Sequence, residues 1–583
     1  MDKNNIGNDI EKTAPRAGKR RKSMLLLLLP LLASLLVYSN SFHNTFLYGD
    51  DENIITRNRY LDDWKYLPEV FSGNLMDGAG ATCNFYRPLQ TTLYMAITGI
   101  SGRGQVWPYH LANTALHGLT GTLFAWLLYA FIPQLGIVPA AAGALAWTLH
   151  PIHVEEITQP SGTQSPMYSF FVIAVLCLLL AGLRRRETEG RSELAPAAGW
   201  LLLANFCLLL GLFSKESAVV AAPLALLLHA AWMRSRALPL PGWGQLAKTH
   251  LPLWIITCVY IILRLTALNF GGTLNFYGSA NIFTEHFIYR VYTLLSVLGE
   301  GVRIFFYPVG LHPERNWPLF TSFLAHKVWI PAAALVLTTF WALRSWRLRA
   351  TLPALALGFF LISYAPMSNL VAQINALMWE HWFYLPSMSF IMLIAAAVNG
   401  GKSRKVFAIT ALCAAAALAP ATYKRNRNWR DPETYSRFVL ANEPSSAKTW
   451  NNLAMSLSQR GDITSAIEAY KRALALNDYY PQTHHNLANA LATAGRLPEA
   501  IEQYKKALAM DTKFHYSHLA LAEIYYNTGN FGMALEHLLK VKEIFPELPG
   551  LDAIITQTRY MSIRTRHAEP PKPSNQLLRK SGL

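Results

Sequence analysis

Charged side chains are scarce in this sequence. They make up 15% of the 583 residues, whereas hydrophobic residues make up 52% and the mean hydropathy is +0.19. A soluble domain carries about 25% charged residues, so this composition excludes both a disordered chain and an ordinary soluble enzyme. The length predicts at least two domains.

Cysteine is scarce as well. The chain has five cysteines and no Cys-x-x-Cys spacing, and four of them lie in apolar runs, at Cys177, Cys207, Cys258 and Cys413. Cysteines in such runs behave as small buried hydrophobic residues. The sequence therefore indicates neither a zinc site nor a disulfide framework.

Basic residues outnumber acidic ones, because Lys and Arg total 52 against 35 for Asp and Glu, a net charge of +17. No single stripe collects the basic residues, which disfavours a nucleic-acid partner. In a membrane protein, a basic surplus is typical of cytoplasmic loops. We therefore expect a chain surrounded by membrane lipid, with no nucleic acid bound.

Apolar segments recur between residues 24 and 425, and most approach the roughly 20 residues that cross a bilayer as a helix. We expect about eleven spans, at 24–37, 107–132, 136–150, 166–183, 198–213, 217–233, 250–268, 327–343, 351–367, 383–399 and 405–421. Basic clusters such as Arg184–Arg186 and Lys402–Lys405 place their loops in the cytoplasm, together with the polar N-terminus 1–23. The loop 42–106 and the C-terminal part then face outward.

The segment 285–307 does not fit this scheme. It is apolar enough to cross, but a crossing would invert the orientation of everything downstream. It also carries Glu300 and Arg303, which are placed to pair one helical turn apart. We interpret it as a re-entrant or interfacial helix, or as one of a pair of spans whose partner the hydropathy does not reveal.

Small residues recur at a fixed period in the last quarter of the chain. The period is 34 residues, and it relates Gly461, Gly495 and Gly529, and likewise Ala466, Ala500 and Ala534. This spacing is typical of tetratricopeptide repeats, helix pairs that stack into an α-solenoid. We expect a connector at 426–445, about three repeats at 446–560 and a basic, disordered tail at 561–583. The concave groove of such an array binds an extended peptide or a partner helix, unless the array is a scaffold without a specific ligand.

Three acids follow the first expected span, at Asp50, Asp51 and Glu52. Acids beside the hydrocarbon are costly unless they are paired or functional. One of them could act as a general base toward an acceptor hydroxyl, or could ligate a metal. The alternative is a solvated loop in which an Asp caps a helix.

Six further polar motifs follow in order. They are YRPL at 86–89, HPIHVE at 150–155, SKE at 214–216, PMSNL at 366–370, EHWFYLPS at 380–387 and RNRNWRD at 425–431. With the aspartate pair and the repeats, they resemble the transmembrane-and-TPR-containing O-mannosyltransferases, which are integral-membrane glycosyltransferases of the GT-C class. The resemblance implies an all-α fold, with a polytopic GT-C-like helix bundle at 24–425 followed by the solenoid. One departure is His381, at a position where the family commonly has Arg.

The resemblance further implies inverting transfer of a sugar, mannose or another hexose, from a polyprenyl-phosphate donor to a protein hydroxyl on the non-cytoplasmic face. The general base is then expected to be Asp51, with Asp50 as the close second, and the sequence does not separate these two adjacent acids. Glu52 is the third candidate. Cations must stabilise the departing lipid phosphate, and the candidates are Arg87, Lys215 and His381, with Arg303 a weaker one. Each of these is alternatively an interfacial side chain or an ion-pair partner.

The remaining donor-site candidates are Glu216, Glu380, His150, His153 and Glu155. We expect the histidine-rich set to line the outward cavity and to bind sugar or acceptor. A less favoured alternative is a divalent metal held by His150, His153, Glu155 and Glu156. No cofactor is firmly expected besides the lipid-linked sugar, which is a substrate.

Other functions remain open at this point. The acceptor could be a lipid or glycan instead of a protein. A membrane-anchored scaffold for a secretion or pilus assembly would need one anchor, not many spans. A transporter would place its ionisable residues near the middle of the bilayer, whereas here they gather at the outward ends of the spans. The expected compartment is a bacterial inner membrane, with the N-terminus in the cytoplasm and the repeats in the periplasm.

Overall fold

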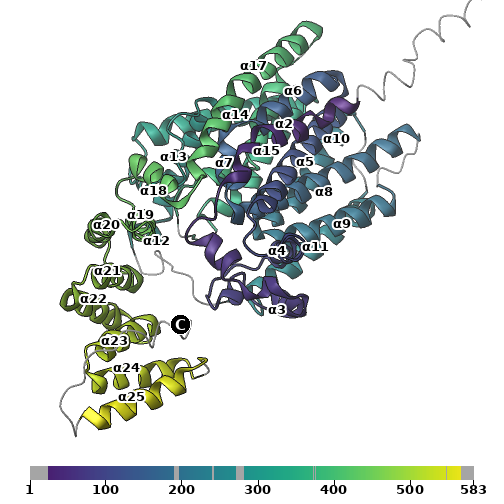
Figure 1. The fold of residues 1–583 in the computed structure, drawn as a ribbon. Helices are drawn as coiled ribbons and strands as arrows, with labels where there is room; N and C mark the ends of the chain where they lie inside the picture. Colours follow the sequence, from purple (N-terminus) through teal and green to yellow (C-terminus); the bar gives the residue numbers. More distant parts are fainter. Residues whose placement is uncertain are drawn as a thin grey trace, which may run out of the picture. The chain divides into compact units, whose positions relative to one another are not determined.

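The computed structural model describes residues 24–189, 196–238, 242–270, 281–371, 373–374, 376–398, 400–546 and 548–565. Within these ranges every helix or strand assigned is a helix, as predicted (Figure 1). The chain divides into two compact units, Met1–Asp431 and Pro432–Leu583. The expectations for the N-terminus 1–23 and for residues 566–583 of the tail lie outside the described residues.

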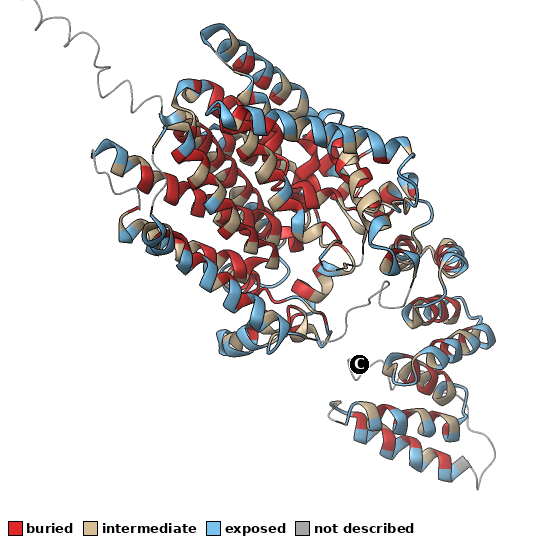
Figure 2. Ribbon diagram, turned by 180° about the vertical axis from the view of Figure 1, so that it is seen from behind, coloured by how far each residue is buried: buried red, intermediate tan, exposed pale blue. Residues whose placement is uncertain are grey.

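The first unit is a helix bundle with its buried residues inside (Figure 2). Its α-helices are α2 (Leu29–Val37), α3 (Leu67–Ser72), α4 (Pro88–Ser101), α5 (Trp107–Phe131), α6 (Ile137–Thr148), α7 (Val154–Thr158), α8 (Gln164–Thr188), α9 (Ala198–Ser214), α10 (Ala221–Ser235), α11 (Trp243–Leu265), α12 (Ile282–Glu285), α13 (Phe287–Phe306), α14 (His326–Arg347), α15 (Leu352–Tyr364), α16 (Met388–Ala396) and α17 (Gly401–Asn426). Short helical turns interrupt them at the polar motifs, namely η3 (Glu52–Thr56), η8 (Pro151–His153), η9 (Pro160–Thr163), η10 (Glu216–Val220) and η12 (Glu380–Phe383).

Seven described helices are long and apolar enough to cross a membrane, or eight if the bent pair Ile137–Thr148 and Pro151–Thr158 forms one span. The seven are Leu25–His43, Trp107–Phe131, Pro160–Thr188, Glu216–Ser235, Trp243–Leu265, His326–Arg347 and Gly401–Trp429. The chain is thus a multi-pass membrane protein.

The predicted number of about eleven spans exceeds this because hydropathy alone counted three shorter segments. Ala198–Ser214 and Leu352–Met367 are apolar helices of fewer than 18 residues. The predicted span 383–399 contains only α16, with nine residues, after the break at η12. The segment 285–307 forms α13, which is not among the candidate spans.

The basic ends of the helices meet at one end of the bundle. The contacts that join them are Arg184 over the Tyr129 ring, Arg236 with Glu187, Arg234 with the Trp346 and Arg347 carbonyls, and Arg404 with the Gln134 carbonyl. They bring together the C-terminal ends of α5, α8, α10 and α14 and the N-terminal end of α17. The polar motifs lie at the other ends of these helices.

The helix that leads into the acidic loop packs tightly on α5 through small residues. A Cβ on Gly118 would lie 2.7 Å from the Cα of Leu31 in α2. The Ser34 hydroxyl of α2 donates a hydrogen bond of 2.9 Å to the Thr114 carbonyl. Small residues allow this close approach between membrane helices, and the approach fixes the start of the loop that carries Asp50 and Asp51.

The second unit contains α18 (Pro432–Asn442), α19 (Ala447–Gln459), α20 (Ile463–Leu476), α21 (Pro481–Thr493), α22 (Leu497–Met510), α23 (His515–Asn527), α24 (Phe531–Ile544) and α25 (Leu551–Thr565). The period-34 glycines sit in the turns with φ of +86°, +77° and +79°, a conformation that glycine adopts without a steric penalty. The period-34 alanines are fully buried between paired helices.

Two boundaries of the repeat unit differ from the prediction. Most of the expected connector 426–445 is helix α18, which packs on α19. At the other end, α25 extends to Thr565, into the expected tail, and buries Leu551 and Ile555 against α24. α18 packs on the first repeat pair and α25 on the last. Neither helix is marked by the hydropathy or by the 34-residue period.

Candidate active site at the polar end of the bundle

The three acids of the first outer loop have three different environments. Asp50 is exposed, directly after Gly49, whose φ is +92°. Asp51 is fully buried. Glu52 is partly exposed, accepts a hydrogen bond of 3.3 Å from the Gly49 amide and pairs with Arg57 at 3.3 Å. Adjacent positions in the sequence therefore carry one solvent-facing carboxylate and two engaged ones.

Asp51 fastens the loop to the start of α8. Its Oδ2 accepts a hydrogen bond of 2.7 Å from the Leu47 amide, and its Oδ1 accepts one of 2.9 Å from the Ser161 amide in η9. Burial raises the pKa of Asp51 to about 6, although both hydrogen bonds oppose that shift. The sequence gave no sign of this burial.

The SKE motif brings Lys215 and Glu216 beside Arg87 of the YRPL motif. The Arg87 guanidinium is 3.5 Å from the Glu216 carboxylate, which also accepts a hydrogen bond from the Tyr86 amide. Lys215 donates a hydrogen bond of 2.9 Å to the Ser165 hydroxyl of α8. The side chains of Arg87 and Lys215 are only 9% and 7% exposed, so both charges lie in a site that water reaches poorly.

His381 lies against two acids of the HPIHVE segment. Its Nδ1 is 3.0 Å from Glu155 Oε1, and its Nε2 is 3.7 Å from Glu156 Oε1. Burial by itself lowers the pKa of His381, whereas Glu155 and Glu156 raise it, and the net direction is upward. The two carboxylates therefore favour the cationic form of the imidazole.

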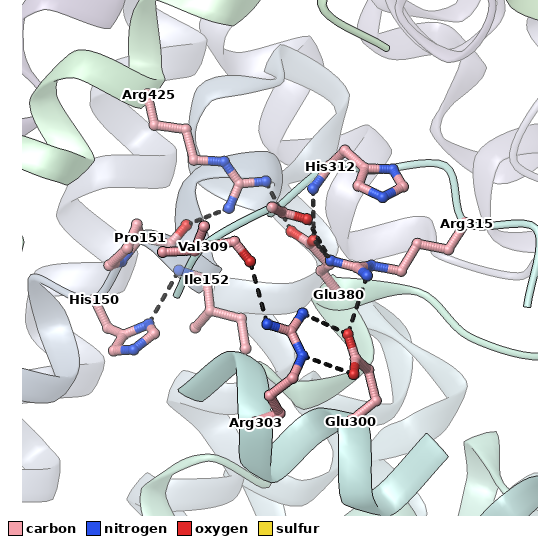
Figure 3. A network of polar contacts seen from close by, with 11 residues as sticks. His150, Pro151, Ile152, Glu300, Arg303, Val309, His312, Arg315, Glu380 and Arg425 are labelled. Atoms are coloured by element: carbon pink, nitrogen blue, oxygen red, sulfur yellow. Dashed lines mark hydrogen bonds and ion pairs between the residues drawn. The ribbon is translucent and has the colours of Figure 1, made fainter. Parts of the chain in front are cut away.

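Glu380 turns the other way and sits at the centre of a buried ion network (Figure 3). It is fully buried, and its oxygens accept hydrogen bonds of 2.6 Å from Arg315 and 2.7 Å from Arg425. The His312 amide adds a third, at 2.6 Å. Arg425 also donates to the Pro151 carbonyl at 2.8 Å. One carboxylate thus ties α17, the loop before α14 and the HPIHVE segment together.

The same network extends to α13. Glu300 accepts hydrogen bonds of 2.8 and 2.6 Å from Arg303 and one of 3.2 Å from Arg315. The side chain of Arg303 is 41% exposed, whereas those of Glu300 and Arg315 are 11% and 8% exposed. The expected pairing of Glu300 with Arg303 is therefore present (Figure 3), and Arg303 is the most exposed of these three side chains.

The histidines of the HPIHVE segment do not form a metal site. His150 bonds the Phe305 carbonyl at 2.8 Å and accepts from the Ile152 amide, while Glu155 faces His381. His153 is fully buried among aromatic rings, 4.8 Å from the Tyr384 ring and 4.6 Å from that of Trp147. Among the described residues, no three His, Cys, Asp or Glu side chains are grouped to hold a metal ion. The alternative metal set of His150, His153, Glu155 and Glu156 is therefore not supported.

The sequence-predicted residues thus gather at one end of the bundle, in two neighbouring groups. One contains the acidic loop, Arg87, Lys215, Glu216, Glu155 and His381; the other contains Glu380, Arg303 and His150. Sequence reasoning missed Arg315 and gave no role to Arg425, although the latter opens the quoted RNRNWRD motif. Arg315 has no signal in the sequence besides its place in a loop between two apolar segments.

Comparisons with known proteins agree with this organisation. Tetratricopeptide-repeat models match residues 443–513 and 485–549, which confirms the predicted repeats. Protein O-mannosyl-transferase TMTC4 of Mus musculus is 23% identical over 504 residues, covering 75% of this chain and 64% of that protein. Protein O-mannosyl-transferase TMTC3 of Homo sapiens is 22% identical over 480 residues, covering 75% of this chain and 50% of that protein.

A shorter match of higher identity is to protein O-mannosyl-transferase tmtc2 of Xenopus laevis, 30% identical over 200 residues, or 34% of this chain and 23% of that protein. Among solved structures, the APC/C hetero-tetramer Cut9–Hcn1 covers 81% of this chain and 93% of its own, at 12% identity and a TM-score of 0.22, which is too low to support an argument about the fold.

The extent of the first two matches is informative. The repeat unit begins at Pro432, so it makes up about a quarter of the chain, and a match over 75% must include much of the helix bundle as well. The chain spans between half and two thirds of the length of these two relatives. It is a distant homologue of the TMTC protein O-mannosyl-transferases, with tetratricopeptide repeats in its C-terminal part.

Proposed function

We propose that the helix bundle transfers a sugar, mannose or another hexose, from a polyprenyl-phosphate donor to a protein hydroxyl on the non-cytoplasmic side of the membrane. The observation that carries this proposal is the homology to O-mannosyl-transferases over 75% of the chain. Under this proposal, the N-terminus lies in the cytoplasm of a bacterium, the repeats lie in the periplasm, and the repeats bind acceptor or partner proteins.

The location of the polar site favours this function over transport. The arginine-rich helix ends meet at one end of the bundle, and the polar motifs lie at the other. A transporter keeps its substrate site near the middle of the membrane. A transferase that acts on a lipid-linked donor needs its charges at the membrane surface, where the lipid phosphate and a water-soluble acceptor meet.

We propose Asp50 as the general base. A base must reach the acceptor hydroxyl, and Asp50 is the exposed acid of the three. Asp51 is the first choice from sequence, but each of its two carboxylate oxygens accepts a hydrogen bond from a backbone amide. We therefore assign Asp51 to holding the loop in place. Glu52 is held by Arg57 and the Gly49 amide.

Arg87, Lys215 and His381 are proposed to stabilise the departing lipid phosphate. Their poor exposure strengthens electrostatic interactions with a phosphate. Glu216, Glu155 and Glu156 hold them in place in the absence of donor. Arg303 is a further candidate, since its side chain is 41% exposed.

The test is the intact mass of extracytoplasmic proteins in cells that lack the gene, complemented with wild type, Asp50→Asn or Asp51→Asn. We expect a hexose-sized mass to disappear with the deletion and to return with wild type. We expect it not to return with Asp50→Asn at equal protein level in the membrane. If both variants restore whatever the deletion removes, the acidic loop is structural, and a scaffold or transporter becomes the better explanation.

A further inference from the structure

Basic side chains gather where the C-terminal ends of α8, α10 and α14 meet, at the end of the bundle opposite to the polar motifs. These three helices end at Thr188, Ser235 and Arg347, and each closes a candidate membrane span. Their last turns therefore lie at a surface of the bilayer. We define the arginine seam as four basic residues of these ends, namely Arg186 on α8, Arg234 and Arg236 at the end of α10, and Arg347 on α14.

Arg234 joins two of the helix ends. Its Nε donates a hydrogen bond of 3.2 Å to the Trp346 carbonyl, and its Nη2 donates one of 3.1 Å to the Arg347 carbonyl. The last carbonyls of a helix lack partners within the helix, and a basic side chain is a usual partner for them. Arg234 is thus a structural residue that holds the end of α10 against that of α14.

Two other arginines of the seam are less well satisfied. The Arg236 guanidinium lies 4.3 Å from the centre of the Trp232 ring, and its Nε is 3.7 Å from the Glu187 carboxylate of α8, too far for a hydrogen bond. The Nε atoms of Arg236 and Arg186 are both buried, and neither has a hydrogen-bond partner among the described residues. A buried donor without a partner costs about 1–3 kcal/mol. Both groups therefore favour an acceptor that the described part of the chain does not supply.

Acidic groups are too few at these helix ends to neutralise the arginines. Within the described residues, the acids on the three ends are Glu187 and Glu189. Glu189 pairs with Arg185 at 2.9 Å, which leaves Glu187 as the one carboxylate beside Arg186 and Arg236. The Glu187 side chain is 39% exposed, and such an exposed pair contributes little. The arginine seam therefore keeps a net positive charge.

The surroundings of the seam are apolar. Leu343 and Leu348 at the end of α14 are 59% and 71% exposed, and Leu348 directly follows Arg347. Leucines exposed at the end of a membrane span contact acyl chains, and a tryptophan such as Trp346 is typical of the headgroup level. Basic pockets between membrane helices bind anionic lipid headgroups. A free phosphate or a nucleotide would gain nothing from the leucines, so the surroundings favour a lipid.

We propose that the arginine seam binds the phosphate of an anionic phospholipid, with Arg236 and Arg186 donating to its oxygens and the acyl chains lying along the exposed leucines of α14. A guanidinium can hold two phosphate oxygens through parallel N–H bonds. The bound lipid supplies the missing acceptor and joins the ends of α8 and α10. This site is separate from the polar end of the bundle, and it does not depend on sugar transfer.

The test uses the purified full-length protein in a neutral detergent, with bound lipid counted by native mass spectrometry. The probes are phosphatidylglycerol and phosphatidylcholine with the same acyl chains, which share the phosphate but differ in net charge. Glycerol phosphate in excess serves as a competitor without chains. The variants are Arg236→Gln, Arg186→Gln and Glu187→Gln. Arg185→Gln is the matched control, because it removes the same charge from the same turn of α8, whereas Arg185 is 66% exposed and bonds Glu189.

We expect phosphatidylglycerol to bind at least about tenfold more tightly than phosphatidylcholine, and glycerol phosphate not to displace it. Arg236→Gln and Arg186→Gln should each weaken binding of phosphatidylglycerol about tenfold, the effect of one hydrogen bond to a charged group. Arg185→Gln should change it about twofold or less, because salt screens an exposed charge. Glu187→Gln should strengthen it about two- to threefold, because the change removes the carboxylate that competes with the phosphate.

The unfolding temperature supplies a second readout, since a ligand that binds only the folded state stabilises it. Phosphatidylglycerol should raise the unfolding temperature of wild type more than that of Arg236→Gln. Unfolding temperatures measured without lipid identify a folding defect. If Arg236→Gln has such a defect, Glu187→Gln decides the test, because that variant retains every arginine.

Three results would each overturn the proposal: equal binding of the two lipids, displacement of the lipid by glycerol phosphate, or variants at Arg186 and Arg236 that bind as Arg185→Gln does. Weaker binding by Glu187→Gln would also contradict it. No sugar donor or acceptor is present, so these outcomes are distinct from those of the proposed function.

Discussion

The two units of this chain hold their charges in opposite ways. In the bundle, Glu380 is fully buried and pairs with Arg315 and Arg425, which lie 65 and 45 positions away in the sequence. In the repeats, pairs such as Arg496 with Glu499 are three positions apart and about half exposed. Exposed local pairs are solvated and contribute little to stability. In a buried pair, by contrast, removing one partner leaves an uncompensated charge, which is strongly destabilising.

The difference indicates where each unit can do chemistry. A transferase needs fixed charges in a site poor in water, so that charge developing on a leaving phosphate is stabilised without reorganisation. The polar end of the bundle has such charges. The repeats keep their charged pairs on exposed helix faces.

The largest expected effect comes from Glu380→Gln. The change leaves Arg425 buried without a counter-charge and leaves Arg315 only its bond of 3.2 Å to Glu300. Removing one partner of a buried pair costs about 3–5 kcal/mol. We expect a much lower unfolding temperature in detergent and a reduced yield of monodisperse protein. If the Glu380→Gln variant unfolds at the same temperature as wild type, the network does not stabilise the bundle.

A smaller effect is expected from pH, through Asp51. Its pKa is raised from 3.8 to about 6 by burial, so the folded state binds the proton more tightly than the unfolded state. The resulting stabilisation is fully present below pH 3.8 and is lost as the pH rises through 6. Between these values we expect wild type to lose about 2–3 kcal/mol relative to Asp51→Asn, measured as the difference between their unfolding temperatures across the pH range. Parallel pH profiles for the two proteins would contradict the burial of this carboxyl.

The smallest effect is expected from Glu499→Gln, which is the same chemical change as Glu380→Gln but in the repeat unit. The pair with Arg496 is about half exposed, and we expect an unchanged unfolding temperature. A loss comparable to that of Glu380→Gln would remove the distinction between the two units.

The sequence predicted the repeats well because their determinants are local. The period of 34 residues places glycines in turns with positive φ and alanines between paired helices, and both follow from the short range over which each repeat folds. The flanking helices α18 and α25 escaped prediction because they lack the repeat's small residues.

The site was predicted in part. The motifs placed Asp50, Asp51, Glu155 and His381 in the outer segments, but the sequence did not distinguish an exposed acid from a buried one beside it. That difference depends on the Ser161 amide, 110 positions away. The two arginine partners of Glu380 were missed for the same reason. The predicted number of spans exceeds the seven or eight candidates because hydropathy does not register that three of the apolar segments form short helices, Ala198–Ser214, Leu352–Met367 and Met388–Ala396.

The most direct test of the central claim is sugar transfer by the purified protein in nanodiscs, from a radiolabelled polyprenyl-phosphate mannose to a hydroxyl-rich acceptor protein. We expect wild type to transfer the label and Asp50→Asn to lose about 10²-fold or more of the rate, since a general base contributes that much. A wild-type protein that transfers no sugar from this or a matching hexose donor, or an Asp50→Asn variant as fast as wild type, would contradict the account.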